Sequence, residues 1–201
     1  MAPTVKDVLT FHKIDRAVYE KFLAYGMVHD KARKAVALFL WLEQLGIDMT
    51  TPIHNIINNV TKISTLITEI DAVLCCLQQN DHEHSYYEIP LITSLAKNSI
   101  DIHFFNLHKD SIVRGLVFLI DGIGRHVFDG YEYGLLRSYE SEVAAAARRS
   151  SAVRPQVPPA LAKLCTPAGC VLSSEQKRSM YITMRRGVLI GRDEIIQHFT
   201  A

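Results

Sequence analysis

Long apolar runs are missing from this sequence of 201 residues. Apolar stretches such as Ala35–Leu42 are far shorter than the roughly 20 residues that an α-helix needs to cross a bilayer. The N-terminus also lacks the basic segment followed by an apolar one that marks a secretory signal. These absences predict a soluble intracellular protein with no membrane span, located in the cytoplasm or nucleus, with an organelle left open.

Cysteine is scarce, and its arrangement does not suggest a metal site. Cys75 and Cys76 are adjacent, so both cannot face one partner, and Cys165 and Cys170 have neither a second pair nor histidines nearby. A structural zinc site needs four suitably spaced ligands. We therefore expect free thiols in a reducing compartment, and we predict no metal and no other cofactor.

Strong charge of one sign and the common catalytic motifs are also absent. The formal net charge is +1 at pH 7, which provides no overall field to attract nucleic acid or acidic membranes. Neither a Gly-x-Ser-x-Gly motif, nor a Walker A motif, nor His-Glu-x-x-His occurs in the sequence. No small-molecule substrate can be identified, and we predict that the protein is not an enzyme.

Helical periodicity is what the sequence does contain. Apolar residues recur every three or four positions across Val8–Tyr25, and Gly26 is the expected end of that helix. Asp30 is a predicted N-cap for the next helix. The centre of that helix, Ala35–Leu42, is apolar on every side and therefore predicts a buried helix that ends at Gly46.

The most regular apolar pattern follows Thr51-Pro52, which reads as an N-cap and a proline in the first helical position. Steps of three and four alternate along a heptad seam that predicts one long helix. Its residues are Ile53, Ile56, Val60, Ile63, Ile67, Ile70, Leu74 and Leu77. Such a seam can form an interface with a partner. The width of the apolar face favours packing inside the same chain.

The remaining helical segments complete a mainly α fold. One begins at Pro90, the next is capped at Asp110 or Ser111 and has Val113 and Val117 on its expected core side, and a last one ends near Arg149. We predict a multi-helix bundle of about six helices over residues 1–149. Residues 150–170 contain four prolines and predict a linker.

Residues 171–201 follow a different pattern. Ser179–Met184 alternates in the manner of a strand, Arg185 and Arg186 lie in the following turn, and a short amphipathic helix comes after them. This order resembles the first βα unit of an RRM, a family in which an aromatic residue of the first strand stacks on a base. Tyr181 matches that position. With the helical domain and the linker, the layout is similar to a group of plant RRM-containing proteins.

The resemblance and the local basic residues lead to two functional hypotheses. The first is a non-enzymatic scaffold or adaptor that binds a protein partner, or another copy of itself, through its helical domain. The alternative is an RNA-associated protein in which Tyr181 stacks on a base while Arg185 and Arg186 contact phosphates. A chain with only part of an RRM would also interfere with an intact relative by occupying its partner.

Overall fold

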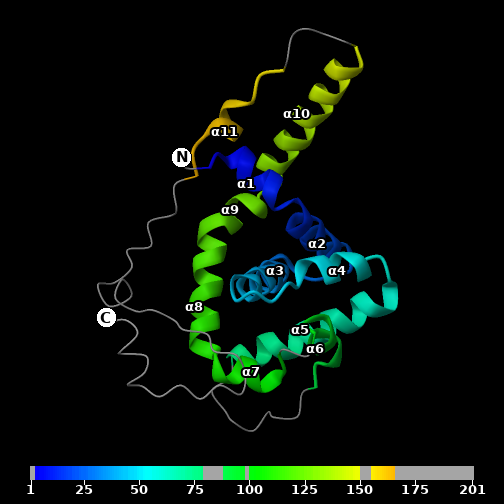
Figure 1. The fold of residues 1–201 in the computed structure, drawn as a ribbon, viewed down its shortest axis with the longest axis vertical. Coiled ribbons are helices and arrows are strands. Elements are labelled where there is room, and N and C mark those ends of the chain that lie inside the picture. The colour runs from blue at the N-terminus through cyan, green and yellow to red at the C-terminus, as the bar shows by residue number, and fades with distance from the viewer. Residues whose placement is uncertain (1–2, 79–87, 98–99, 150–154, 166–201) are drawn as a thin grey trace, which may run out of the picture. The chain divides into compact units, whose positions relative to one another are not determined.

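The computed structural model describes residues 3–78, 88–97, 100–149 and 155–165, and these form helices and their connections (Figure 1). The chain divides into one unit at residues 1–170 and a second at residues 171–201. The second unit, with the predicted RRM-like strand and helix, lies outside the described residues. Within the described part the mainly α prediction is confirmed, since the β-structure there is one isolated bridge between Thr4 and Leu164.

The helices are shorter than the sequence pattern suggests. In chain order they are α1 (Val5–Phe11), α2 (Lys13–Ala24), α3 (His29–Gln44), α4 (Thr50–Ile56), α5 (Val60–Gln78), α6 (Pro90–Leu95), α7 (Ile102–Leu107), α8 (Lys109–Leu119), the π-helical turn η1 (Ile120–Gly124), α9 (Arg125–Val127), α10 (Gly130–Arg148) and α11 (Pro159–Ala162). Several predicted helices are therefore divided by short turns, and the simple bundle of about six helices is not what the described residues form.

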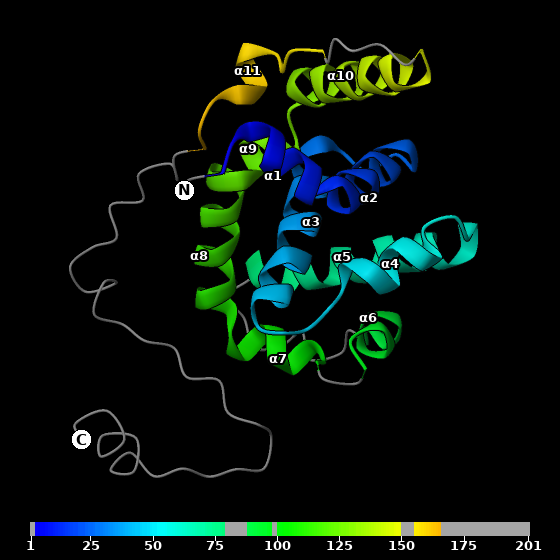
Figure 2. The same cartoon turned by 45° about the horizontal axis from the view of Figure 1, so that its top comes forward.

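Helix α3 lies at the centre of the fold, and Ala35–Leu42 is buried throughout, as its apolar composition predicts. Helices α2, α4, α5 and α8 contact it and lie around it in the two views (Figures 1 and 2). Gly26 and Gly46 adopt φ values of +86° and +81°, which confirms the two predicted helix ends. The predicted cap at Asp30 is wrong: Val28 is the N-cap, and Asp30 lies in the first turn, paired with Lys34.

The predicted continuous helix from Ile53 to Leu77 is two helices in the structure. Helix α4 ends at Ile56, and α5 begins at Val60 after a short connection. The Asn59 side chain accepts a hydrogen bond of 3.0 Å from the Lys62 backbone N–H, as an N-cap does. This local alternative to the helical backbone bond is the physical reason for the break. Helix α4 also begins earlier than predicted, with Met49 as its N-cap.

The seam residues mostly pack inside their own chain. Ile53, Ile63 and Ile70 are fully buried, Leu74 and Leu77 are buried, Ile56 and Ile67 are partly buried, and Val60 is 65% exposed. The predicted interface along this seam is therefore corrected, because these side chains form the core between α3, α5 and their neighbours. These positions agree with the alternative prediction, in which the seam packs against other helices of the same chain.

Part of the predicted linker is folded. Leu161 of α11 is fully buried in a small second cluster with Val5, Leu9 and Leu136. Two backbone bonds hold the segment against the start of the chain: Val5 N–H donates to the Lys163 carbonyl, and Cys165 N–H to the Pro3 carbonyl, both at 2.8 Å. The prolines of this segment restrict its backbone, but they do not prevent Leu161 from packing into a core. Residues 150–154 and 166–170 lie outside the described residues.

Candidate functional site

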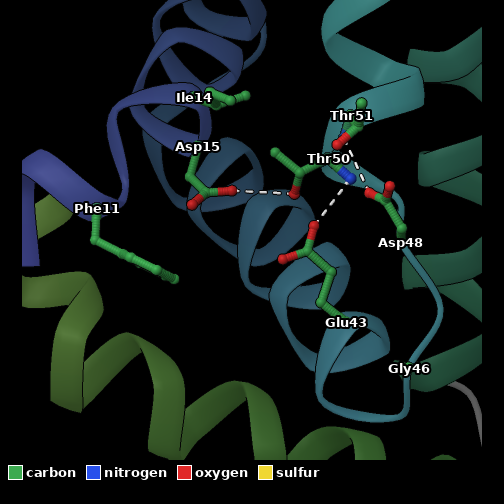
Figure 3. A pocket seen from close by; sticks show the side chains of 8 residues that line it. All are labelled: Phe11, Ile14, Asp15, Glu43, Gly46, Asp48, Thr50 and Thr51. Carbon is green, nitrogen blue, oxygen red and sulfur yellow. Dashed lines mark hydrogen bonds between the residues drawn. The ribbon is translucent and has the colours of Figure 1, made fainter.

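A pocket of about 420 Å³ opens where α1, α2, α3 and α4 meet (Figure 3). Three carboxylates line it, those of Asp15, Glu43 and Asp48. Phe11, which is 82% exposed, and the half-exposed Ile14 lie on its apolar side. The pocket brings together residues that are far apart in the sequence.

Each carboxylate of the pocket already has a role in the fold. Glu43 accepts a hydrogen bond of 3.0 Å from Thr50 N–H, and Asp48 accepts one of 3.1 Å from Thr51 N–H (Figure 3). The first N–H groups of a helix lack partners within that helix, and nearby negative charge stabilises them. Glu43 and Asp48 therefore cap α4 and attach it to the end of α3.

The third carboxylate, Asp15, joins a histidine and a threonine, which invites comparison with a catalytic triad. Its Oδ2 lies 2.7 Å from His12 Nδ1, and its Oδ1 accepts a hydrogen bond of 3.1 Å from Thr50 Oγ1. In a triad the histidine lies between the acid and the hydroxyl, so that its ring nitrogen can take the proton. Here the acid lies in the middle, and Thr50 is buried. This group connects α2 to α4 and lacks the order needed for nucleophilic catalysis.

Two further buried charged residues also have structural partners. Arg16 donates a hydrogen bond of 3.0 Å to the Val127 carbonyl and pairs with Glu20 at 2.9 Å. Glu69 accepts hydrogen bonds of 2.9 and 2.8 Å from the N–H groups of Leu91 and Ile92 and so caps α6. Their charges are satisfied within the fold, as buried charges require.

The described cysteines are free thiols, and no group that could bind a metal surrounds them. Burial raises the pKa of Cys76 above its ordinary value of 9.0. Burial is also the main cause that raises the pKa of Cys165. Cys76 donates a hydrogen bond of 2.8 Å to the Asn106 side chain. Over residues 3–78, 88–97, 100–149 and 155–165, three or more metal-binding side chains do not gather anywhere.

The outward face of α8 remains as a surface without a structural explanation. Val113, Val117 and Phe118 are 41%, 56% and 45% exposed, although all three are large and apolar. Together with the exposed Arg114 they are called the α8 surface below. The assignment of Val113 and Val117 to the core side is therefore wrong.

The opposite face of α8 explains this orientation. Ile112, Leu116 and Leu119 are buried against the core. Gly115 touches the indole of Trp41 on α3, where a Cβ would lie 2.5 Å from Nε1. Because α8 has apolar residues on more than one side, periodicity alone could not decide which side faces the core. Gly115, which permits the close approach to Trp41, was the sequence feature that could have indicated the buried side.

The residues proposed for RNA contact, Tyr181, Arg185 and Arg186, lie outside the described residues, so their role stays a prediction. Within the described part of the chain, none of the helices is both long and apolar enough to span a membrane. The fold and surface thus define a helical protein unit with an outward apolar helix face. No family model, curated protein or solved structure matches this chain.

Proposed function

We propose that this protein is a non-enzymatic interaction protein that binds another protein chain through the α8 surface. The supporting observation is the exposure of Val113, Val117 and Phe118 over two turns of a helix whose other side is held in the core. A contiguous patch of exposed apolar side chains commonly marks a binding site. An aromatic residue among them adds a large contact area to such a site.

The charged residues beside these side chains fit the same role. Arg114 lies within the α8 surface, and Asp110 and Asp121 lie one turn from it along the chain. Protein interfaces commonly have an apolar centre with a polar rim, and the rim selects the partner more than it adds affinity. A helix of a partner protein is the simplest element to pack along this stripe, since two helices bury apolar faces against each other.

Site-specific photo-cross-linking tests this function. A benzoylphenylalanine placed at Val117 of the full chain should cross-link to a protein in the cells that express it. The same group at Arg137, an exposed residue of α10, is the control because it lies away from the α8 surface. Cross-links at position 117 that do not exceed those at position 137 would overturn the proposal.

The RNA-associated function remains a second candidate, supported by the sequence pattern around Tyr181, which predicts a strand, a turn and a helix. In this function the helical unit recruits a partner while Tyr181, Arg185 and Arg186 contact RNA. Interference with an intact relative would follow if both share that partner. Filter binding at low salt with Tyr181→Ala and with Arg185→Ala/Arg186→Ala tests RNA contact, and affinities identical to that of the unmodified chain would end this hypothesis.

A further inference from the structure

The charges along α8 and η1 follow a two-fold pattern centred between Val117 and Phe118. Arg114 lies three positions before Val117, and Asp121 lies three positions after Phe118. Seven positions before Val117 is Asp110, and seven positions after Phe118 is Arg125. Residues at equal distances before and after this centre therefore carry opposite charges. A helix with this pattern is complementary to a second copy of itself that runs antiparallel.

The positions from Asp110 to Asp121 also share one side of the helix, whereas Arg125 follows the π-helical turn η1. With about 3.6 residues per turn, steps of three, four and seven return to the same face. The stripe consists of Asp110, Arg114, Val117, Phe118, Asp121 and Arg125, all of which are exposed. The pattern therefore lies where a second molecule can reach it, whereas Ile112, Leu116 and Leu119 on the other side lie in the core.

The charges of the stripe are available to a partner. Among the described residues, the side chains of Asp110, Arg114 and Asp121 form no ion pair within their own chain. Arg125 donates one hydrogen bond from Nε, 2.9 Å long, to the Asp121 backbone carbonyl, which leaves the Asp121 carboxylate unused. A second copy would supply the opposite charge for each of them.

We propose that the α8 surface binds a second copy of this chain, with the two α8 helices antiparallel. Val117 and Phe118 would lie at the centre, and Arg114 would face the partner's Asp121. This inference rests on the proposed function and names the partner of its surface. Because a two-fold interface repeats every contact, the pair between Arg114 and the partner's Asp121 occurs twice, and its effect on association is doubled.

The inner charge pair tests the inference better than the outer one. Gly122, inside η1, has a non-helical conformation with φ −85° and ψ −108°, so the helix changes direction there. Arg114 and Asp121 both precede this kink, about 10 Å apart along the axis. The outer pair of Asp110 and Arg125 spans it and depends on the path of the chain beyond Gly122.

The size of the stripe indicates a reversible dimer. Stable complexes bury about 800 Å² on each partner, which is more than one short helix face offers. We therefore expect association in the micromolar range, and a measurement must cover about 1 to 300 µM of the full chain. Charge complementarity selects the antiparallel register, while burial of Val117 and Phe118 supplies the attraction.

Charge exchange on the full chain, followed by analytical ultracentrifugation, tests this arrangement. Arg114→Asp places two like-charged pairs in the dimer, and so does Asp121→Arg, so each single variant should associate roughly tenfold or more weakly. The double variant Arg114→Asp/Asp121→Arg should regain the affinity of the unmodified chain. An equimolar mixture of the two single variants should form a mixed dimer, because both of its charge pairs are again opposite.

Control variants and outcomes separate this inference from the proposed function. Arg137→Asp reverses an exposed charge on α10 and should leave association unchanged. An unmodified chain that stays monomeric at every concentration overturns the dimer, as does a mixture of single variants no more associated than each alone. If position 117 then cross-links to a different protein, the proposed function stands and only the second copy is rejected. If it cross-links to nothing, both fail.

Discussion

At the residue scale, the contact between Gly115 and Trp41 determines how closely α8 can approach α3. A Cβ at Gly115 would overlap the indole ring, with Nε1 at 2.5 Å, and a core aromatic has little room to move. We predict that Gly115→Ala lowers the free energy of unfolding by about 1–3 kcal/mol. The midpoint of urea denaturation measures this change.

Gly134 is the matched control for that substitution. It lies inside α10, and a Cβ there would meet nothing within 4 Å. Gly134→Ala should therefore raise stability by about 0.5–1 kcal/mol through helix propensity. If both variants shift the urea midpoint in the same direction, the close packing of α8 against α3 at Gly115 is not what the structure indicates.

The capping box of α1 gives a residue-scale prediction about pH. Asp7 Oδ2 accepts hydrogen bonds from Thr4 N–H at 3.0 Å and from Thr4 Oγ1 at 2.7 Å, and the Thr4 side-chain bond is the main cause that lowers the Asp7 pKa below 3.8. Because the folded-state pKa is below the unfolded value, Asp7 contributes stability above pH 3.8 that disappears as the pH falls through its folded-state pKa.

Thermal melting of the unmodified chain and of Asp7→Asn at several pH values tests this linkage. The unmodified chain should melt at a higher temperature near neutral pH, and the difference should shrink in acid as the carboxyl protonates. A difference between the two melting temperatures that is the same in acid and at neutral pH would contradict the role of the Asp7 charge. Glu142→Gln, at an exposed position on α10, is the control.

At the scale of elements, α11 supports the N-terminal helix. Leu161 is fully buried against Val5, Leu9 and Leu136, in a cluster separate from the larger core. We predict that Leu161→Ala costs about 2–4 kcal/mol, because it removes a buried side chain and leaves a cavity. Leu164→Ala is the control, since Leu164 is 59% exposed.

Hydrogen exchange shows where the effect of Leu161→Ala falls. The backbone amides of Val5 to Phe11 should exchange faster in this variant, while those of α5 should exchange at the rate of the unmodified chain. Residues 155–165 would behave as a linker, contrary to the structure, if Leu161→Ala and Leu164→Ala had equally small effects on both stability and exchange.

The sequence could predict elements where one physical signal dominated. Complete apolar character predicted the buried α3, and Gly26, Gly46 and Pro90 marked helix ends that the structure has. Prediction failed where two signals competed. The cap at Asn59 interrupted a seam that heptad spacing alone made continuous, and packing of Leu161 overrode the proline-rich composition around it.

The candidate site was harder to predict than the fold. The heptad residues were the strongest apolar pattern, and the chain uses most of them in its own core. The exposed residues of α8 have a weaker pattern, and only the structure shows that Gly115 and Leu116 turn Val117 outward. A surface is what remains after the core has formed, so its residues cannot be identified before the packing is known.

At the scale of the whole molecule, we propose that the outward face of α8 binds a protein, and that this protein is a second copy of the chain. The buried charged side chains discussed above have partners within the chain: those of Asp15, Arg16 and Glu69. Val117 and Phe118 form the apolar centre of the α8 surface.

Light scattering on the full chain over a range of concentrations tests that claim most directly. We expect the molar mass to rise from 22.7 kDa toward twice that value, whereas Val117→Ser/Phe118→Ser stays at 22.7 kDa with an unchanged helical circular-dichroism spectrum. The helices should persist because the buried side of α8, with Ile112, Leu116 and Leu119, is not changed. Equal molar masses for the unmodified chain and the double variant at every concentration would contradict self-association through the α8 surface.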